Sequence, residues 1–213
     1  MMRLKVCGMT KIDQLKELEN MGVDFAGLIF YDRSPRYVMK FGLTPEILKK
    51  EKLGINRVGV FVNETVDQVL RIVDEWKLHM VQLHGDESPR YCEQISNHIT
   101  TIKAFRIGED DNVSYKTFPF VENTDLFLFD TKAKQYGGTG EQFDWSLLKK
   151  QSIPKPYFLS GGIGPDDVEK IKEFCSTERK VFSLDVNSVF ELSPGIKDMK
   201  KVKAFNESIK SNI

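Results

Sequence analysis

The sequence predicts an α/β fold, a single (β/α)8 barrel of the TIM type that spans residues 1–213 as one domain. Short runs of β-branched and aromatic residues recur along the chain, and amphipathic segments separate them. This alternation is typical of βαβ units with a parallel sheet. Eight runs match a closed barrel, and an open doubly wound sheet is the alternative. The runs are Leu4–Cys7, Phe25–Phe30, Val58–Val62, Met80–Leu83, Thr101–Phe105, Leu126–Phe129, Tyr157–Leu159 and Val181–Val186.

Helices are expected between these runs, and proline marks the first turn of two of them, at Thr44-Pro45 and Gly164-Pro165. The segment 109–124 is polar and contains Pro119. We therefore expect a short or degenerate fifth helix. The helical segments are Lys11–Met21, Pro45–Lys52, Val66–Trp76, Pro89–Asn97, Trp145–Lys150, Pro165–Phe174 and Met199–Ile209.

The composition excludes several classes of protein. The chain has 31 basic and 31 acidic residues, so no global charge favours nucleic acid or an acidic membrane. No apolar run approaches the roughly 18–20 residues of a membrane span, and we expect no signal peptide. Three cysteines without a CxxC pair argue against a disulfide framework and a zinc site. A reducing cytoplasm is the expected location.

The residues that follow each run include every candidate for chemistry. In a barrel the carboxyl ends of the strands meet at one face, where active sites are built. We therefore expect one site that contains Cys7, Arg36, His84, Asp130, Gly161, Gly162, Asp185 and Ser188.

Cys7 and Asp130 are the candidates for proton transfer. A thiol at a strand end can act as a base or nucleophile if its pKa falls, although a free cysteine is often only a small buried residue. Asp130 ends an apolar strand and precedes a loop with Gly137, Gly138 and Gly140. Burial among the strand's aromatic residues would raise its pKa and make it an acid, and the loop would gate its pocket. The alternative is an aspartate that caps its own loop.

Arg36 and His84 are candidates for binding a ligand. The planar guanidinium of Arg36 suits a carboxylate, and the alternative is a surface arginine paired with Asp32. His84 could stack on an aromatic ligand, donate a proton or have a purely structural role. His79 and His98 are expected to be structural or exposed, and the spacing of the histidines indicates no metal site.

Glycines after the seventh run predict an anion site. Ser160–Pro165 leads into a helix, and backbone N–H groups at such a helix start can bind phosphate. The alternative is a tight turn that needs positive φ. Residues 185–188, after the eighth run, would supply the other side, with Asp185 and Ser188 as its candidates. Neither GxGxxG nor a P-loop lysine is present, so a dinucleotide or ATP site is not indicated.

Seven segments, taken together and in order, resemble the phosphoribosylanthranilate isomerase family over about Leu4 to Lys197. They are KVCGMT, GLIFYDRSPRYV, GVFVN, VQLHGDES, FLFDTKAKQYGGTGEQFDW, FLSGGIGPDDV and DVNSVFELSPGIKD. The resemblance implies a (β/α)8 barrel that catalyses an Amadori rearrangement in tryptophan biosynthesis without a cofactor. It implies a phosphorylated small-molecule substrate, with the protein as a monomer or homodimer.

The resemblance also implies roles for individual residues. Cys7 is similar to the general base, Asp130 to the general acid and Arg36 to the clamp on the anthranilate carboxylate. Gly161 and Gly162, with Ser188, are similar to the phosphate site. One residue departs from the family pattern, since Val189 stands where glycine is usual. If that glycine needs positive φ, the loop must bend differently here.

Three other functions remain open at this stage. The sister sugar isomerase of histidine biosynthesis performs the same rearrangement on a diphosphorylated substrate, but it is expected to carry aspartate at the position of Cys7. A catalytically silent barrel that senses a phosphorylated ligand is the second. A thiol hydrolase is the third, with Cys7 as nucleophile and His84 as its base.

Overall fold

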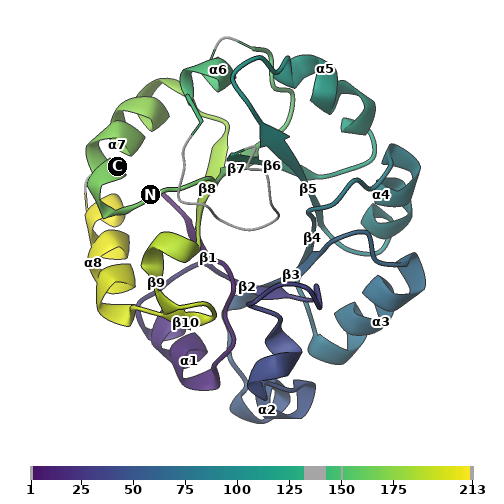
Figure 1. Cartoon of the computed structure of the whole chain (residues 1–213), viewed down its shortest axis with the longest axis vertical. Coiled ribbons are helices and arrows are strands. Elements are labelled where there is room, and N and C mark those ends of the chain that lie inside the picture. Colours follow the sequence, from purple (N-terminus) through teal and green to yellow (C-terminus); the bar gives the residue numbers. More distant parts are fainter. Residues whose placement is uncertain (1, 132–142, 150, 212–213) are drawn as a thin grey trace.

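The computed structural model describes residues 2–131, 143–149 and 151–211, and these residues form a closed parallel barrel surrounded by helices (Figure 1). The eight strands pair in chain order, and β8 closes the ring by pairing with β1. The predicted fold class is therefore confirmed. The strands are β1 (Leu4–Val6), β2 (Phe25–Ile29), β3 (Asn56–Phe61), β4 (Met80–Leu83), β5 (Thr101–Ile107), β6 (Leu126–Thr131), β7 (Tyr157–Leu159) and β8 (Val181–Val186).

The helices follow the predicted segments, and their first turns show why they begin where they do. The Thr44 hydroxyl accepts a hydrogen bond from the Ile47 N–H, with proline at the first turn. The fifth helix is only five residues long before a 3-10 turn, as the polar segment predicted. The helices are α1 (Ile12–Asn20), α2 (Pro45–Glu51), α3 (Val66–Trp76), α4 (Pro89–Ser96), α5 (Val113–Thr117), α6 (Ser146–Lys149), α7 (Val168–Thr177) and α8 (Met199–Lys210), with 3-10 turns η1 (Val38–Phe41), η2 (Phe118–Phe120), η3 (Pro165–Asp167) and η4 (Ser188–Phe190).

The alternation of side chains along each strand divides the core into two layers. In β6, Phe127 and Phe129 pack outward against the helices, whereas Leu126 and Leu128 fill the barrel interior. The amino-terminal part of the interior is apolar. It is filled by Phe25, Val58, Met80, Ile102, Ala104, Leu126, Leu128 and Phe158.

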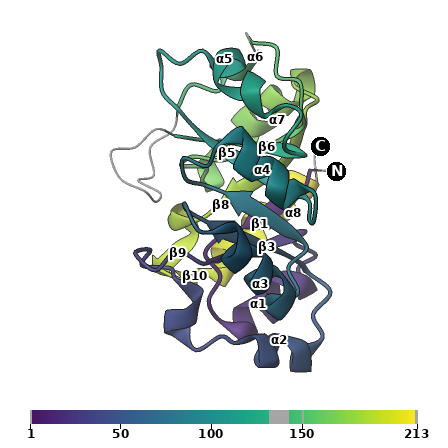
Figure 2. The ribbon, with the colours of Figure 1, turned by 90° about the vertical axis from the view of Figure 1, so that its right-hand side faces the viewer.

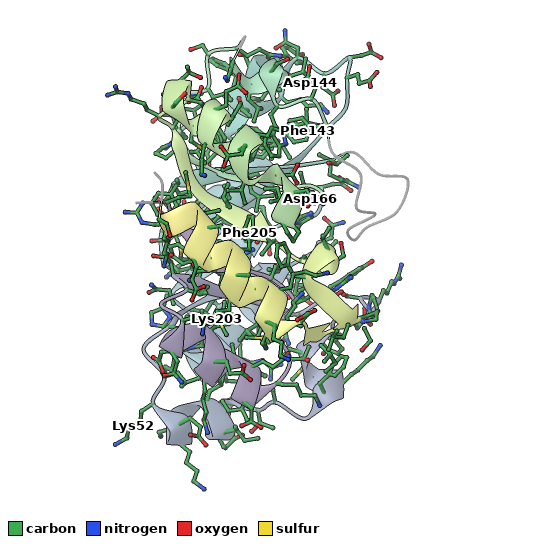
Figure 3. All side chains as sticks on the ribbon, turned by 90° about the vertical axis from the view of Figure 1, so that its left-hand side faces the viewer. Lys52, Phe143, Asp144, Asp166, Lys203 and Phe205 are labelled. Carbon is green, nitrogen blue, oxygen red and sulfur yellow. The ribbon has the colours of Figure 1, made fainter. Side chains whose placement is uncertain are left out.

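A short antiparallel hairpin, β9 (Glu191–Ser193) and β10 (Ile196–Lys197), follows η4 and was not predicted. Figure 2 shows it on the side of the barrel opposite the two chain termini. Phe205 of α8, labelled in Figure 3, packs against Phe190, with ring centroids 5.0 Å apart. This contact fixes the segment that connects β8 to the hairpin.

A buried ion pair joins the loop after β4 to β5. The Lys103 ammonium lies 3.0 Å from Glu87 Oε2, and the side chains are 4% and 2% exposed. Lys103 also donates to the carbonyls of Leu83 and Gly85, and the other Glu87 oxygen accepts from the backbone of Asn63 and Gly85. The pair therefore fastens the loops after β3 and β4 to strand β5.

None of the helices in the described ranges has the length and hydropathy of a membrane span.

Replacing Glu87 by glutamine should destabilise the barrel by about 3 kcal/mol, because it leaves the Lys103 ammonium buried without its counter-charge. Urea denaturation measures this change as a loss in the free energy of unfolding. The control is Glu75→Gln, which breaks the exposed Arg71–Glu75 pair (60% and 48% exposed) and should change stability by less than about 1 kcal/mol. Equal losses in the two variants would show that the buried pair has no special importance.

Candidate active site

A cavity lies at the carboxyl ends of the strands, lined by side chains and loops from several of them. All eight residues that the sequence singled out line this cavity. They are Cys7, Arg36, His84, Asp130, Gly161, Gly162, Asp185 and Ser188. Each comes from a strand end or from the loop that follows, so the closed barrel brings them together.

Cys7 follows β1, and its side chain is directed into the cavity beside Gly27 of β2. Its N–H donates to the Val186 carbonyl at 2.8 Å, and the residue is 5% exposed. Burial raises the pKa of the Cys7 thiol; the Lys5 and Lys197 ammonium groups oppose this, whereas Asp185 adds to it. Both lysines are placed to stabilise the thiolate.

Gly27 makes room for that thiol. A Cβ at position 27 would lie 2.8 Å from Cys7 Sγ and 3.0 Å from Cys7 Cα, closer than side chains approach. The requirement is one of space, because Gly27 is not among the glycines with positive φ.

Asp130 lies on the inward side of β6, two positions after Leu128. Its Oδ1 accepts from the Thr131 N–H at 2.9 Å, and its Oδ2 lies 3.4 Å from His84 Nε2. The side chain is 24% exposed, so the prediction that it is buried among the aromatic residues of its strand was wrong. The two phenylalanines of β6 face the helices, whereas Asp130 faces the cavity. The predicted loop glycines Gly137, Gly138 and Gly140 lie outside the described residues.

Arg36 is buried at 8% exposure, and its partner is Glu191 of β9 rather than Asp32. Its Nε and Nη2 atoms lie 2.9 Å and 2.7 Å from the two Glu191 oxygens. Lys197 of β10 lies 2.8 Å from the same carboxylate. Burial alone would raise the pKa of Glu191. The positive charges of Arg36 and Lys197 lower that pKa by more than burial raises it, so it lies below the usual range. The surface pair with Asp32, which was the alternative interpretation, is therefore wrong, and the unpredicted hairpin supplies a buried partner.

Asp185 lies deeper in the barrel, where Lys5 holds it. The Lys5 ammonium is fully buried and lies 2.9 Å from Asp185 Oδ1 and 2.7 Å from Gln82 Oε1. Burial would lower the pKa of Lys5, but Asp185 and Cys7 raise it above the usual value. Sequence reasoning missed Lys5 and Gln82, and the signal was alternation. Each lies two residues before a predicted site residue, Cys7 and His84, on the same inward face.

The glycine segment after β7 forms a tight turn with positive φ, which was the alternative to an anion site. Gly161 and Gly162 have φ of 91° and 66°. A Cβ at Gly161 would lie 2.3 Å from Thr131 Oγ1, so glycine also allows this loop to approach the end of β6. Both glycines line the cavity together with Ser188, which follows the neighbouring strand β8. Figure 3 shows Asp166, at the start of the segment leading into α7, on the side of the molecule from which the β9–β10 hairpin projects.

Val189 fits its position without a left-handed backbone. It lies in the 3-10 turn η4, and the described non-glycine residues with positive φ are Lys52, Asn63 and Lys77. Its side chain instead packs toward Gly164, where a Cβ would lie 3.2 Å from Val189 Cγ1. The loop therefore accepts valine because it forms a helical turn.

The remaining histidines and cysteines have no part in this cavity. His79 and His98 are exposed, and Cys92 is buried within α4, as expected. The ring nitrogens of His84 face Gln82 and Asp130, so His84 is not placed as a base for Cys7. Within the described ranges, no three His, Cys, Asp or Glu side chains are grouped so as to hold a metal ion.

Fold and site together define a (β/α)8-barrel enzyme with a thiol and a carboxyl group at opposed strand ends. The profile of the N-(5'-phosphoribosyl)anthranilate isomerase family matches residues 4–208, and the chain belongs to that family. It is therefore an aldose–ketose isomerase of tryptophan biosynthesis.

Relatives and solved structures agree with this assignment. The chain is 38% identical to the N-(5'-phosphoribosyl)anthranilate isomerase of Parabacteroides distasonis, over 98% of this chain and 93% of the relative. It superposes with a TM-score of 0.78 and 30% identity on monomers generated from the dimeric Thermotoga maritima enzyme, covering 99% of both chains. It superposes equally, again with 30% identity, on a family member in complex with reduced 1-(o-carboxyphenylamino)-1-deoxyribulose 5-phosphate, covering 99% of this chain and 100% of that one.

Replacing Gly27 by alanine should lower kcat about 100-fold, because the new methyl group displaces Cys7, and a 1 Å misplacement can cost that much. The protein should remain folded, since overpacking costs about 1–3 kcal/mol. Steady-state kinetics and a thermal melt measure the two effects. Gly54→Ala is the control, because its new Cβ meets only the end of the flexible Glu19 side chain at 3.1 Å. A folded Gly27→Ala variant with unchanged kcat would contradict the steric argument.

Proposed function

We propose that this chain converts N-(5'-phosphoribosyl)anthranilate into 1-(o-carboxyphenylamino)-1-deoxyribulose 5-phosphate by general acid and base catalysis. The observation that carries the proposal is the placement of Cys7 and Asp130 on β1 and β6, across one cavity. The reaction needs one group to give a proton and another to take one, and it needs no net oxidation.

The proposed sequence of steps begins at Asp130. Its carboxylic acid protonates the ribose ring oxygen, the C1'–O bond breaks, and the nitrogen lone pair forms a Schiff base. Cys7 as thiolate then removes the C2' proton, and the electron pair moves to give an enolamine. Tautomerisation of the enolamine gives the ketone. General acid and base catalysis contributes about 10²–10⁴-fold each, so holding the open-chain sugar supplies much of the rest.

Arg36 would bind the anthranilate carboxylate. Its Nε and Nη2 atoms are occupied by Glu191, and among the described residues its Nη1 group has no acceptor. The Glu191 contact therefore fixes the plane of the guanidinium and leaves one edge for a ligand.

Gly161, Gly162 and Ser188 would bind the phosphate through backbone N–H groups and the serine hydroxyl. Asp185 is a carboxylate beside Lys5, so it suits a sugar hydroxyl better than a phosphate. His84 lines the cavity next to Asp130 and would contact the substrate there. No cofactor is part of this proposal.

Two alternatives are weaker on specific grounds. The diphosphate isomerase of histidine biosynthesis needs a second phosphate loop after the third strand. The segment GVFVNETV, which covers the end of β3 and the loop after it, contains no glycine cradle. A silent ligand sensor would not need Cys7 and Asp130 across one cavity. Turnover assays with both the monophosphate and the diphosphate substrate separate the first alternative, and complementation of a tryptophan auxotroph that lacks only this isomerase tests the function. Turnover of the diphosphate substrate alone would overturn the proposal.

We further propose that the enzyme works in the cytoplasm as a monomer or homodimer. All three cysteines are free thiols, which suits a reducing compartment. The dimeric relative from Thermotoga maritima makes a homodimer the form to test by light scattering in solution.

Cys7→Ala and Asp130→Asn should each abolish measurable turnover, because each removes one end of the proton transfer. Binding of the reduced product analogue should remain within a few-fold of wild type, since neither change alters the phosphate loop or Arg36. Calorimetry of each variant with the analogue measures binding apart from chemistry. Near wild-type activity in either variant would exclude that residue from the mechanism.

Arg36→Lys should raise KM roughly 10- to 100-fold with a smaller change in kcat, because lysine cannot bridge Glu191 and a ligand carboxylate in one plane. The matched control is Arg33→Lys on the same loop, where the arginine is exposed. Steady-state kinetics of both variants tests the role. Equal KM values in the two variants would remove Arg36 from carboxylate binding.

A further inference from the structure

A line of polar side chains runs along the base of the cavity from Lys5 to Asp130. It begins at Lys5 of β1, whose ammonium lies 2.7 Å from Gln82 Oε1 of β4. Gln82 Nε2 lies 2.7 Å from His84 Nδ1, and His84 Nε2 lies 3.4 Å from Asp130 Oδ2. Gln82 is 1% exposed, so its amide has no alternative partner in bulk water.

The chemistry of the groups fixes the direction of each hydrogen bond. An ammonium group has donors only, so the Gln82 atom that faces Lys5 must be the amide oxygen. The other end of that amide is then the NH2 group, which also has donors only. His84 Nδ1 must therefore accept, and a neutral imidazole that accepts at Nδ1 carries its proton on Nε2. The Nε2 atom that carries this proton lies 3.4 Å from Asp130 Oδ2.

We propose that Gln82 is a positioning residue that keeps His84 neutral, with its proton on Nε2, so that His84 donates to the Asp130 carboxyl group. The role of Asp130 as acid rests on the proposed function; the state of His84 does not. With Oδ2 facing His84 and Oδ1 accepting from the Thr131 N–H, the plane of the carboxyl group is fixed.

The same contact also excludes the charged form of His84. An imidazolium carries a proton on Nδ1, which would face the Gln82 NH2 group donor to donor. A charged His84 would hold Asp130 as a carboxylate, and a carboxylate cannot protonate the sugar. Besides His84, the ionisable groups that line the cavity are Cys7, Tyr31, Arg36, Asp130 and Asp185, with Lys5 below them. Arg106 of β5, the strand between His84 and Asp130, is the register partner of Asp130. A negative charge on Asp130 would favour the charged form of His84, and the contact with Gln82 opposes that effect.

Gln82→Glu replaces the NH2 group that faces His84 Nδ1 by an oxygen, so that a donor becomes an acceptor. The carboxylate still accepts a hydrogen bond from Lys5, but its second oxygen can only accept as well, so it requires a proton on His84 Nδ1 and favours the imidazolium. ¹⁵N NMR of the histidine rings distinguishes the two neutral tautomers and the charged form. The chain has three histidines, and His79, whose Nδ1 accepts from the Arg57 N–H at 3.0 Å, serves as the internal reference with the same tautomer.

In the wild type we expect a neutral His84 protonated on Nε2 at pH 7, like His79. In Gln82→Glu the midpoint of His84 protonation should move up by about one pH unit or more, while His79 stays unchanged. Turnover should fall roughly 10- to 100-fold at neutral pH and recover partly as pH rises past the new midpoint, with KM changed less than about threefold. Loss of a merely structural contact would lower activity without this recovery.

A wild-type His84 protonated on Nδ1, or charged at pH 7, overturns the proposal whatever the activity is. An unmoved His84 midpoint in Gln82→Glu overturns it as well. Gln82→Met, which keeps the volume and removes the donor, provides a second variant should the glutamate protein fold poorly; it should show a mixture of tautomers, and an unchanged single tautomer would contradict the proposal. Failure of wild-type turnover on the anthranilate substrate, with the expected NMR result, would reject the proposed function alone.

Discussion

The buried ammonium of Lys5 is the group on which the arrangement of the site depends. An isolated charge inside a barrel is too costly to retain, so every neighbour of Lys5 must be an acceptor or a counter-charge. Asp185 and Gln82 meet this demand directly, at 2.9 Å and 2.7 Å. Once Lys5 has determined which end of the Gln82 amide is oxygen, the direction of the remaining contacts toward His84 follows. One lysine thus sets the side-chain orientations on β1, β4 and β8, of which β4 is not a neighbour of the other two.

The closed sheet decided how much of this could be predicted from the sequence. Alternation of apolar residues predicted the strands, and the barrel placed their carboxyl ends on one face. The eight candidate residues could therefore be assigned to one site from position alone. Alternation also placed Lys5 and Gln82 inward, but a polar residue within an apolar strand does not reveal its partner. That partner comes from another strand, and the distance across the barrel depends on registers that the sequence does not state.

Arg36 shows which contact could not be predicted from the sequence and why. Its loop contains Asp32 four residues away, and local spacing offered only that partner. Its carboxylate is Glu191, 155 residues along the chain, on a hairpin that follows the eighth strand. The hairpin has only short strands and contains Pro194, so nothing in its pattern distinguished it from a loop. Burial decides between the two partners, since a surface pair contributes little and an enclosed arginine must be neutralised.

The two ends of the cavity differ in the charges that surround them. At one end, burial and Asp185 raise the pKa of the Cys7 thiol, and the Lys5 and Lys197 ammonium groups offset part of that rise. Asp130 is flanked by a backbone N–H and by His84, whose charge Gln82 keeps at zero. If His84 were cationic, both ends would favour negative charge and neither could donate. In the proposed mechanism, the neutral histidine is therefore the feature that allows a proton to enter the sugar at one end of the cavity and leave it at the other.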